Sequence, residues 1–161
     1  MAGLVPVKIG LIGASDCTER GWDLALKVGA LVAGRKAVLI CGGMGGVMKA
    51  GAKGAFEAGG LTIGFLPGTS DRDANPYIVI PISTGMMQAR NMLIVRAADA
   101  LIAVEGGYGT LSEIGLALNL GKTVVGLDTW QHIPGVHHAK DPEDAVTKAF
   151  QSLDHSLRSG G

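Results

Sequence analysis

Short runs of apolar residues alternate along the chain with longer segments whose apolar positions recur at helical spacing. The apolar runs are β-branched and aliphatic, and they fall at residues 7–13, 36–41, 61–66, 98–104 and 122–127, with a shorter one at 78–82. Such runs predict β-strands that are buried on both faces. The longer segments predict helices at residues 19–33, 47–59, from 85 onward, 109–121 and 141–153.

Strands that alternate with helices in this way form parallel sheets joined by right-handed crossovers. The sequence therefore predicts a Rossmann-like three-layer α/β/α sandwich with a mostly parallel sheet. A chain of this length forms one domain, which we place at residues 1–161 with a core at about 7–157. Residues 122–127 are expected to be the final strand.

Local signals mark the ends of several elements. Asp16 or Thr18 is expected to cap the first helix, because their side chains accept hydrogen bonds from free backbone N–H groups. Asp141 is expected to cap the last helix, with Pro142 at its first position. The polar segment at 67–77, rich in Pro, Asp and Asn, predicts the main loop.

Composition and charge exclude several classes of function. Lys plus Arg equals Asp plus Glu at 14 each, so no basic surface is expected to neutralise a nucleic acid backbone. Cys17 and Cys41 have neither CxxC spacing nor a matching histidine pattern, which argues against a disulfide framework or a zinc site. No stretch reaches about 18 consecutive apolar residues. We expect a cytoplasmic protein that binds neither nucleic acid nor membrane.

Many of the 26 glycines follow predicted strands, and two loops share the order Gly-Gly-x-Gly before a helix. The carboxyl ends of parallel strands are where such sheets bind ligands, and N–H groups at a helix start hold phosphate or carboxylate. Neither loop has the spacing of a P-loop or of G-x-G-x-x-G. The alternative interpretation is that these glycines only permit tight turns between strand and helix. The presence of two similar loops favours a shared anion pocket instead. Its glycines are Gly42, Gly43, Gly45 and Gly46, then Gly106, Gly107 and Gly109.

The segment "TGMMQARNMLIVRAADALIAVEGGYGTLSEIGLALNLG", residues 84–121, resembles the Lonely Guy family of cytokinin-activating phosphoribohydrolases, of the lysine-decarboxylase-like superfamily. The family hallmark is P-G-G-x-G-T-x-x-E with an Arg-Lys pair upstream. Thr110 and Glu113 match it together with the glycines of the second loop, and Arg90 matches the upstream arginine. With the first glycine loop included, the resemblance extends over most of the chain up to about residue 127.

This resemblance implies hydrolysis of the N-glycosidic bond of a nucleoside 5′-monophosphate. Glu113 would stabilise positive charge on the ribose or orient the attacking water, and Arg90 would hold the phosphate or engage the base. The phosphate would lie on the N–H groups of residues 107–110, which include Tyr108, with the Thr110 hydroxyl as a further donor. Ser15 and the glycines of the first loop would complete the pocket.

Two positions depart from the hydrolase pattern and are therefore candidate specificity residues. Glu105 replaces the proline, and Asn91 replaces the lysine after the arginine. Both changes remove or oppose positive charge, so an inward Glu105 would repel a phosphate, whereas an outward one would pair elsewhere. On the inward interpretation, Glu105→Pro would tighten nucleotide binding.

A smaller bacterial subgroup of the superfamily, similar to the molybdenum cofactor carrier proteins of algae and cyanobacteria, fits these departures. Such carriers bind a phosphorylated pterin without a hydrolytic step. Three functions therefore stay open: phosphoribohydrolase, carrier with molybdenum cofactor as cargo, and nucleotide-binding sensor. None of them requires a resident cofactor. The family also implies a homodimer or a larger homo-oligomer.

Several candidate residues have structural interpretations as well. Thr110 and Glu113 have the spacing of a capping box. Arg96 is expected to form a surface ion pair with Asp99. Methionines at helical spacing fill cores more often than they bind ligands, and these are Met86, Met87 and Met92. Cys41 is expected to be buried.

A metal site and a pyridoxal enzyme are both disfavoured. His132, His137 and His138 lie on a predicted loop without carboxylate support, so we expect no metal there. A pyridoxal enzyme needs a lysine facing the pocket, but Lys49 and Lys53 fall on the helix after the first glycine loop. The activity of a lysine decarboxylase is therefore rejected.

Overall fold

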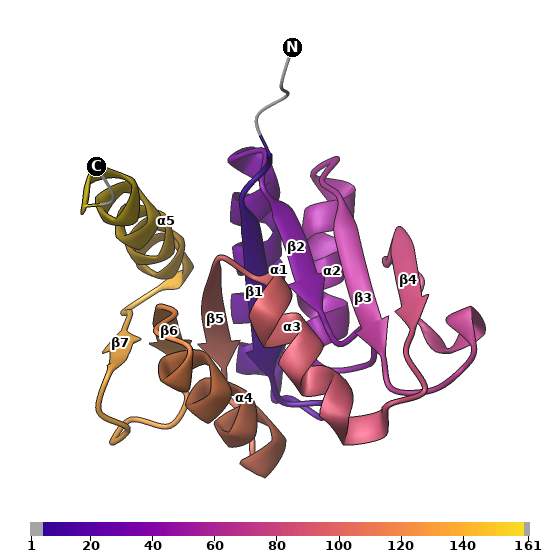
Figure 1. Ribbon diagram of the computed structural model, residues 1–161. Helices are drawn as coiled ribbons and strands as arrows, with labels where there is room; N and C mark the ends of the chain where they lie inside the picture. The colour runs from indigo at the N-terminus through magenta and orange to yellow at the C-terminus, as the bar shows by residue number, and fades with distance from the viewer. Residues whose placement is uncertain (1–4, 160–161) are drawn as a thin grey trace.

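The computed structural model describes residues 5–159 and shows one parallel sheet with helices on both faces (Figure 1). Positions 1–4 and 160–161 of the predicted domain lie outside the described residues. The strands lie in the order β4-β3-β2-β1-β5-β6-β7. Their bounds are β1 (Lys8–Gly13), β2 (Val38–Cys41), β3 (Thr62–Leu66), β4 (Ile80–Ser83), β5 (Ala100–Val104), β6 (Val124–Leu127) and β7 (Val136–His138).

Five α-helices and two short 3₁₀ segments connect the strands within the described part of the chain. The α-helices are α1 (Glu19–Gly34), α2 (Val47–Glu57), α3 (Asn91–Ala97), α4 (Tyr108–Asn119) and α5 (Pro142–Ser159), and the 3₁₀ segments are η1 (Asp71–Asp73) and η2 (Met87–Arg90). The predicted Rossmann-like sandwich is thus confirmed, with a sheet that is parallel throughout.

Alternating strand residues divide the core into two layers. Ile9 and Leu11 of β1 pack with α1, α2 and α5, whereas Ile12 packs with α3 and α4 on the opposite face. The same division is visible in Figure 1, where α3 and α4 lie in front of the sheet and α1 and α2 behind it. Each fully buried aliphatic side chain of this kind contributes roughly 1.5–3 kcal/mol, so burial on both faces holds the helices against the sheet.

The capping predictions agree with the structure. Thr18 is the N-cap of α1, and its hydroxyl accepts a hydrogen bond from Gly21 N at 3.0 Å. Asp141 Oδ1 accepts a hydrogen bond from Asp144 N at 2.8 Å, immediately before α5 begins at Pro142. Both helices therefore begin where the short-range signals place them.

Two elements differ from the expectation. β7 extends the sheet beyond β6, although His137 and His138 have no apolar pattern and were expected in a loop. β7 forms because its backbone pairs with that of β6, and its side chains show no pattern that would predict a strand. The helix expected from residue 85 begins as η2 at Met87 and becomes α-helical at Asn91. Met86 and Met87 are exposed rather than core residues.

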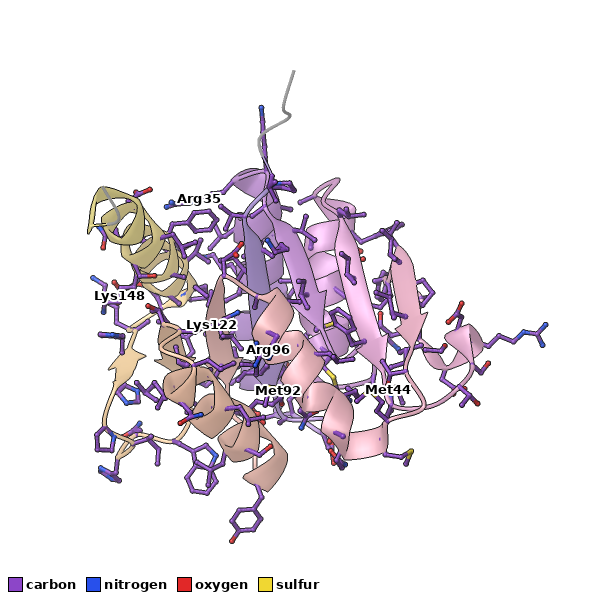
Figure 2. The ribbon with its side chains drawn as sticks, in the orientation of Figure 1. Arg35, Met44, Met92, Arg96, Lys122 and Lys148 are labelled. Carbon is purple, nitrogen blue, oxygen red and sulfur yellow. The ribbon has the colours of Figure 1, made fainter. Side chains whose placement is uncertain are left out.

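The side-chain amine of Lys122 holds the C-terminus of α3. Lys122 Nζ donates hydrogen bonds to the carbonyl oxygens of Val95, Arg96 and Ala98 at 2.8, 2.7 and 2.5 Å, and Figure 2 shows Lys122 beside Arg96. The predicted pair between Arg96 and Asp99 is wrong, because Asp99 instead forms an ion pair with Lys8 Nζ at 3.1 Å. These contacts fix α3, one wall of the site described below.

Within residues 5–159, no helix combines the length and the apolar character that crossing a bilayer requires.

Candidate functional site

A cavity of about 380 Å³ opens at the carboxyl ends of the central strands. The chain crosses from β1 to β2 on one side and places β5 on the other, so the cavity lies at the topological switch point of the sheet. Its walls come from the end of β1 and the loop after it, from Gly42 after β2, from η2 and α3, and from the start of α4. Most of the predicted site residues meet here: Ser15, Gly42, Arg90, Asn91, Gly107, Tyr108, Gly109, Thr110 and Glu113.

The N-terminus of α4 forms one wall and has no internal cap. Gly107 is the N-cap residue, no side chain accepts from the first N–H groups, and no acidic residue lies in the first turn. Gly106 has φ 102°, and a Cβ there would lie 2.2 Å from Thr110 Oγ1, so this position needs glycine. Gly106 does not itself line the cavity. Free N–H groups and a positive helix end suit an anionic ligand group.

Glu113 lies in the interior of α4 with only 8% of its surface exposed, and it lines the cavity. Burial raises the pKa of its carboxyl to about 7, and the positive charge of Arg90 limits the rise. Among the contacts of the described residues, none is a hydrogen bond to Glu113. The capping box with Thr110 does not form, because α4 begins at Tyr108 with Gly107 as its N-cap, so Thr110 lies inside the helix. Burial of a carboxyl without a hydrogen-bond partner costs free energy, and groups of this kind cluster at functional sites.

Arg90 reaches the same cavity from η2. Its Nε donates to the carbonyl oxygen of Phe65 at 2.9 Å, and its Nη1 donates to Asn91 Oδ1. Burial lowers the pKa of Arg90 below its ordinary value, whereas Glu113 opposes the change. Asn91 therefore orients the guanidinium at the place where the hydrolase pattern has a second cation. Arg90 and Glu113 influence each other electrostatically without a direct ion pair.

The first glycine loop contributes less to the cavity than the sequence suggested. Gly42 lines it, whereas Gly43, Gly45 and Gly46 do not. Gly46 has φ 58°, and a Cβ there would lie 2.2 Å from the carbonyl oxygen of Ala14. Glycine here permits close packing on the loop after β1, so the interpretation as a tight turn holds for this position.

Two further groups in the first loop are structural. Gly43 N donates to Cys41 Sγ at 3.4 Å, and burial raises the pKa of the Cys41 thiol to about 11. Cys41 is therefore the buried, unreactive residue that its sequence context predicts. The two glycine loops, similar in sequence, differ in role.

Glu105 turns away from the cavity and is not among its lining residues. Its carboxylate accepts hydrogen bonds from Thr18 N at 3.1 Å and from the Thr18 hydroxyl. The interpretation of an inward, repelling Glu105 is therefore wrong. Its φ is 51°, a conformation that proline cannot adopt, so Glu105→Pro would strain the loop and is not a test of charge.

One exposed aromatic side chain, that of Tyr108, lines the cavity, and Trp130 lies beside it outside the lining. Tyr108 is 84% exposed, and its ring centroid lies 6.0 Å from that of Trp130. Trp130 Nε1 donates to the carbonyl oxygen of Gly107 at 3.2 Å, which fixes the indole beside α4. Sequence reasoning missed Trp130, and it also missed Met48 and Gln88 in the lining. The sequence did contain a signal for Trp130. It is an aromatic residue shortly after the strand at 122–127, which ends beside the second glycine loop.

No metal centre accompanies these residues in the described part of the chain. There, no group of three His, Cys, Asp or Glu side chains is arranged to hold a metal ion. The lining of the cavity includes the charged side chains of Arg90 and Glu113, beside the start of α4.

Comparison with known proteins places the chain in a family. Residues 6–154 match the SLOG cluster4 family. The chain belongs to the SLOG cluster4 family. It is 47% identical over 146 residues to an uncharacterized protein of Archaeoglobus fulgidus, covering 91% of this chain and 96% of the relative. It is 37% identical over 131 residues to a cytokinin riboside 5′-monophosphate phosphoribohydrolase of Mycobacterium tuberculosis, covering 71% of this chain and 66% of the relative.

Two solved structures resemble this SLOG cluster4 protein over nearly its whole length. The molybdenum cofactor binding protein of Rippkaea orientalis has a TM-score of 0.89 and 32% identity, covering 94% of this chain and 99% of that one. The Moco carrier protein of Chlamydomonas reinhardtii has a TM-score of 0.86 and 34% identity, covering 94% and 99%. The resemblance to phosphoribohydrolases and to cofactor carriers, inferred from the glycine motif, is confirmed.

Proposed function

We propose that this SLOG cluster4 protein binds a phosphorylated heterocycle of the nucleoside 5′-monophosphate type and hydrolyses its N-glycosidic bond. The observation that carries the proposal is Glu113, a carboxyl that is buried, lacks a hydrogen-bond partner and faces a cavity with an uncapped helix N-terminus. The phosphate lies on the N–H groups at the start of α4, and the heterocycle lies beside Tyr108.

Each group in the cavity supplies a separate part of the reaction. The Glu113 carboxylate takes a proton from a water molecule whose oxygen attacks C1′, and it stabilises the positive charge that develops on the ribose. The bond between C1′ and the base nitrogen breaks, its electron pair leaves with the base, and the proton that Glu113 took from the water then passes to the base. Arg90, half-enclosed and oriented by Asn91, supplies positive charge for the phosphate or the departing base.

The reaction is tested by incubating the protein with adenosine 5′-monophosphate and measuring free adenine and ribose 5-phosphate. Wild type and Glu57→Gln, which changes an exposed carboxylate of α2, should release both products, whereas Glu113→Gln should lose the activity. Because the ionised form of Glu113 is the active one, release should rise as pH passes through about 7. Equal rates for wild type and Glu113→Gln would refute this role of Glu113.

A second candidate function is carriage of a molybdenum cofactor without hydrolysis. The full-length similarity to a cofactor binding protein and to a carrier favours it, since the hydrolase match covers less of both chains. A pKa of about 7 leaves Glu113 partly uncharged at neutral pH, which permits a phosphorylated cargo beside it. Co-elution of pterin fluorescence with the protein, without release of adenine from the monophosphate, would select the carrier over the hydrolase.

A further inference from the structure

The guanidinium of Arg90 lies at the carboxyl ends of β2 and β3. Its Nε donates to the carbonyl oxygen of Phe65, in β3, at 2.9 Å. Its Nη2 lies against Gly42, directly after β2, because a Cβ on that glycine would be only 2.9 Å from it. Gly42 therefore leaves the room that the guanidinium occupies, and both residues line the cavity.

Part of the hydrogen-bonding capacity of this guanidinium is already used. A guanidinium carries five N–H groups. Nε donates one to Phe65, and Nη1 donates one to the side-chain oxygen of Asn91, which is only 5% exposed and so holds the group in place. Among the hydrogen bonds of residues 5–159, no other acceptor takes a proton from Arg90. Five less two leaves three N–H groups, two on Nη2 and one on Nη1, and these nitrogens are neighbours.

The start of α4 lies at the end of a different strand. α4 follows β5, and β1 separates β5 from β2 in the sheet. Neighbouring strands lie about 4.7–4.9 Å apart, so the ends of β2 and β5 are roughly 10 Å apart. A phosphate at the start of α4 and the guanidinium of Arg90 are thus on opposite sides of the cavity. In a nucleoside 5′-monophosphate, the group on the far side of the ribose from the phosphate is the base.

Neighbouring N–H groups on one planar guanidinium suit two acceptors that lie side by side. The N7 and O6 atoms of a 6-oxopurine form such a pair. Adenine instead places the donating amino group where O6 would be, which leaves an N–H group of the arginine without an acceptor. An enclosed site discriminates strongly against a ligand that leaves its polar groups unpaired.

We propose that Arg90, oriented by Asn91 and given room by Gly42, contacts the base of the ligand and selects 6-oxopurine 5′-monophosphates over the adenine nucleotide. The inference rests on the proposed function for the phosphate at α4, and it assigns Arg90 to the base instead of the phosphate. Tyr108 contacts the face of the ring, and Arg90 contacts its edge. An N–H group bonded to N7 also stabilises the electron pair that the purine receives when its bond to C1′ breaks.

Calorimetry with inosine and adenosine 5′-monophosphates tests this selection, because the two ligands differ only around position 6 of the purine. Both are titrated into Glu113→Gln, so that hydrolysis does not interfere. The inosine nucleotide should bind about tenfold more tightly. Adding Arg90→Lys, which keeps the charge but loses the planar pair of donors, should bring the ratio of dissociation constants to about one. Adding Arg96→Lys, at an exposed arginine of α3, should leave the ratio unchanged.

Ribose 5-phosphate separates the two ends of the ligand, because it has no base. Arg90→Lys should leave its dissociation constant unchanged, and a loss as large as that for the inosine nucleotide would place the phosphate at Arg90 and overturn the inference. Gly42→Ala keeps every donor. Its Cβ meets only the flexible ends of Met48, at 2.7 Å from Sδ, and of Arg90, so the fold is retained while the guanidinium moves. The preference for the inosine nucleotide should fall in this variant too.

The outcomes distinguish this inference from the proposed function. Equal binding of the two nucleotides, or a preference that survives Arg90→Lys, would overturn the role of Arg90 and leave the proposed function intact. If the preference is present but wild type releases neither hypoxanthine nor adenine, the hydrolysis fails and the role of Arg90 stands. Absence of binding for both nucleotides and ribose 5-phosphate would refute the phosphate site and this inference together.

Discussion

Replacing Glu113 by glutamine should make the protein more stable at neutral and alkaline pH. The carboxyl is 8% exposed and has a pKa of about 7, raised by burial from its ordinary value of 4.5. Between these two values the folded protein binds a proton that the unfolded chain has lost, so the stability of wild type falls as pH rises. Glutamine has no charge to bury and escapes this loss.

The magnitude follows from the same two values. Each pKa unit corresponds to about 1.36 kcal/mol, so a rise from 4.5 to about 7 destabilises the ionised form by roughly 3 kcal/mol. The difference between Glu113→Gln and wild type should therefore be near zero below pH 4.5, grow up to about pH 7 and stay constant above it. At roughly 2–4 °C per kcal/mol for a chain of this size, the melting temperature should increase by about 6–12 °C at pH 8.

Urea unfolding of both proteins at intervals from pH 4.5 to 9 measures this difference. Glu57→Gln is the matched control, since its carboxylate is exposed on α2 and should show no such rise with pH. If Glu113→Gln and wild type differ by the same amount at pH 5 and pH 8, the carboxylate is not destabilised by burial, and its assignment as a strained functional group fails.

Two further changes test the walls of the cavity. Lys122→Met removes an amine that donates to the carbonyl oxygens of Val95, Arg96 and Ala98, and it should cost about 1–2 kcal/mol of unfolding free energy in urea. A loss within experimental error would show that the amine does not hold α3. Tyr108→Ala should weaken binding of adenosine 5′-monophosphate about tenfold relative to ribose 5-phosphate in calorimetry, because it removes the exposed ring on which the base would stack. Tyr108→Phe should retain that preference, and an equal loss for both ligands would argue against stacking.

The layered fold could be read from the sequence because its signals are local. Each strand of the core appears as an apolar run, and the caps at Thr18 and Asp141 depend on neighbours within a few residues. β7 could not be read in the same way, since its pairing with β6 is a contact between backbones and its histidines carry no strand pattern.

The candidate site was predicted in part. Thr110, Glu113 and Arg90 were brought together by the motif and the resemblance, and they do line one cavity. The glycines of the first loop were overestimated, because a glycine near a strand end serves close packing as readily as ligand binding, as Gly46 does. Trp130 was missed because its contact with the carbonyl of Gly107 joins residues 23 positions apart.

The sequence by itself determined the succession of strands and helices along the chain, apart from β7, and the placement of two glycine loops at the carboxyl ends of strands, because periodicity and turn chemistry act over short distances. Only the tertiary structure decided which groups surround the carboxylates of Glu105 and Glu113. Glu105 accepts hydrogen bonds from Thr18, the N-cap residue of α1, which lies 87 positions away in the chain. Glu113 lines a cavity together with residues of β1 and α3. Burial and distant hydrogen bonds give the two carboxylates opposite roles, and neither is encoded in the residues beside them.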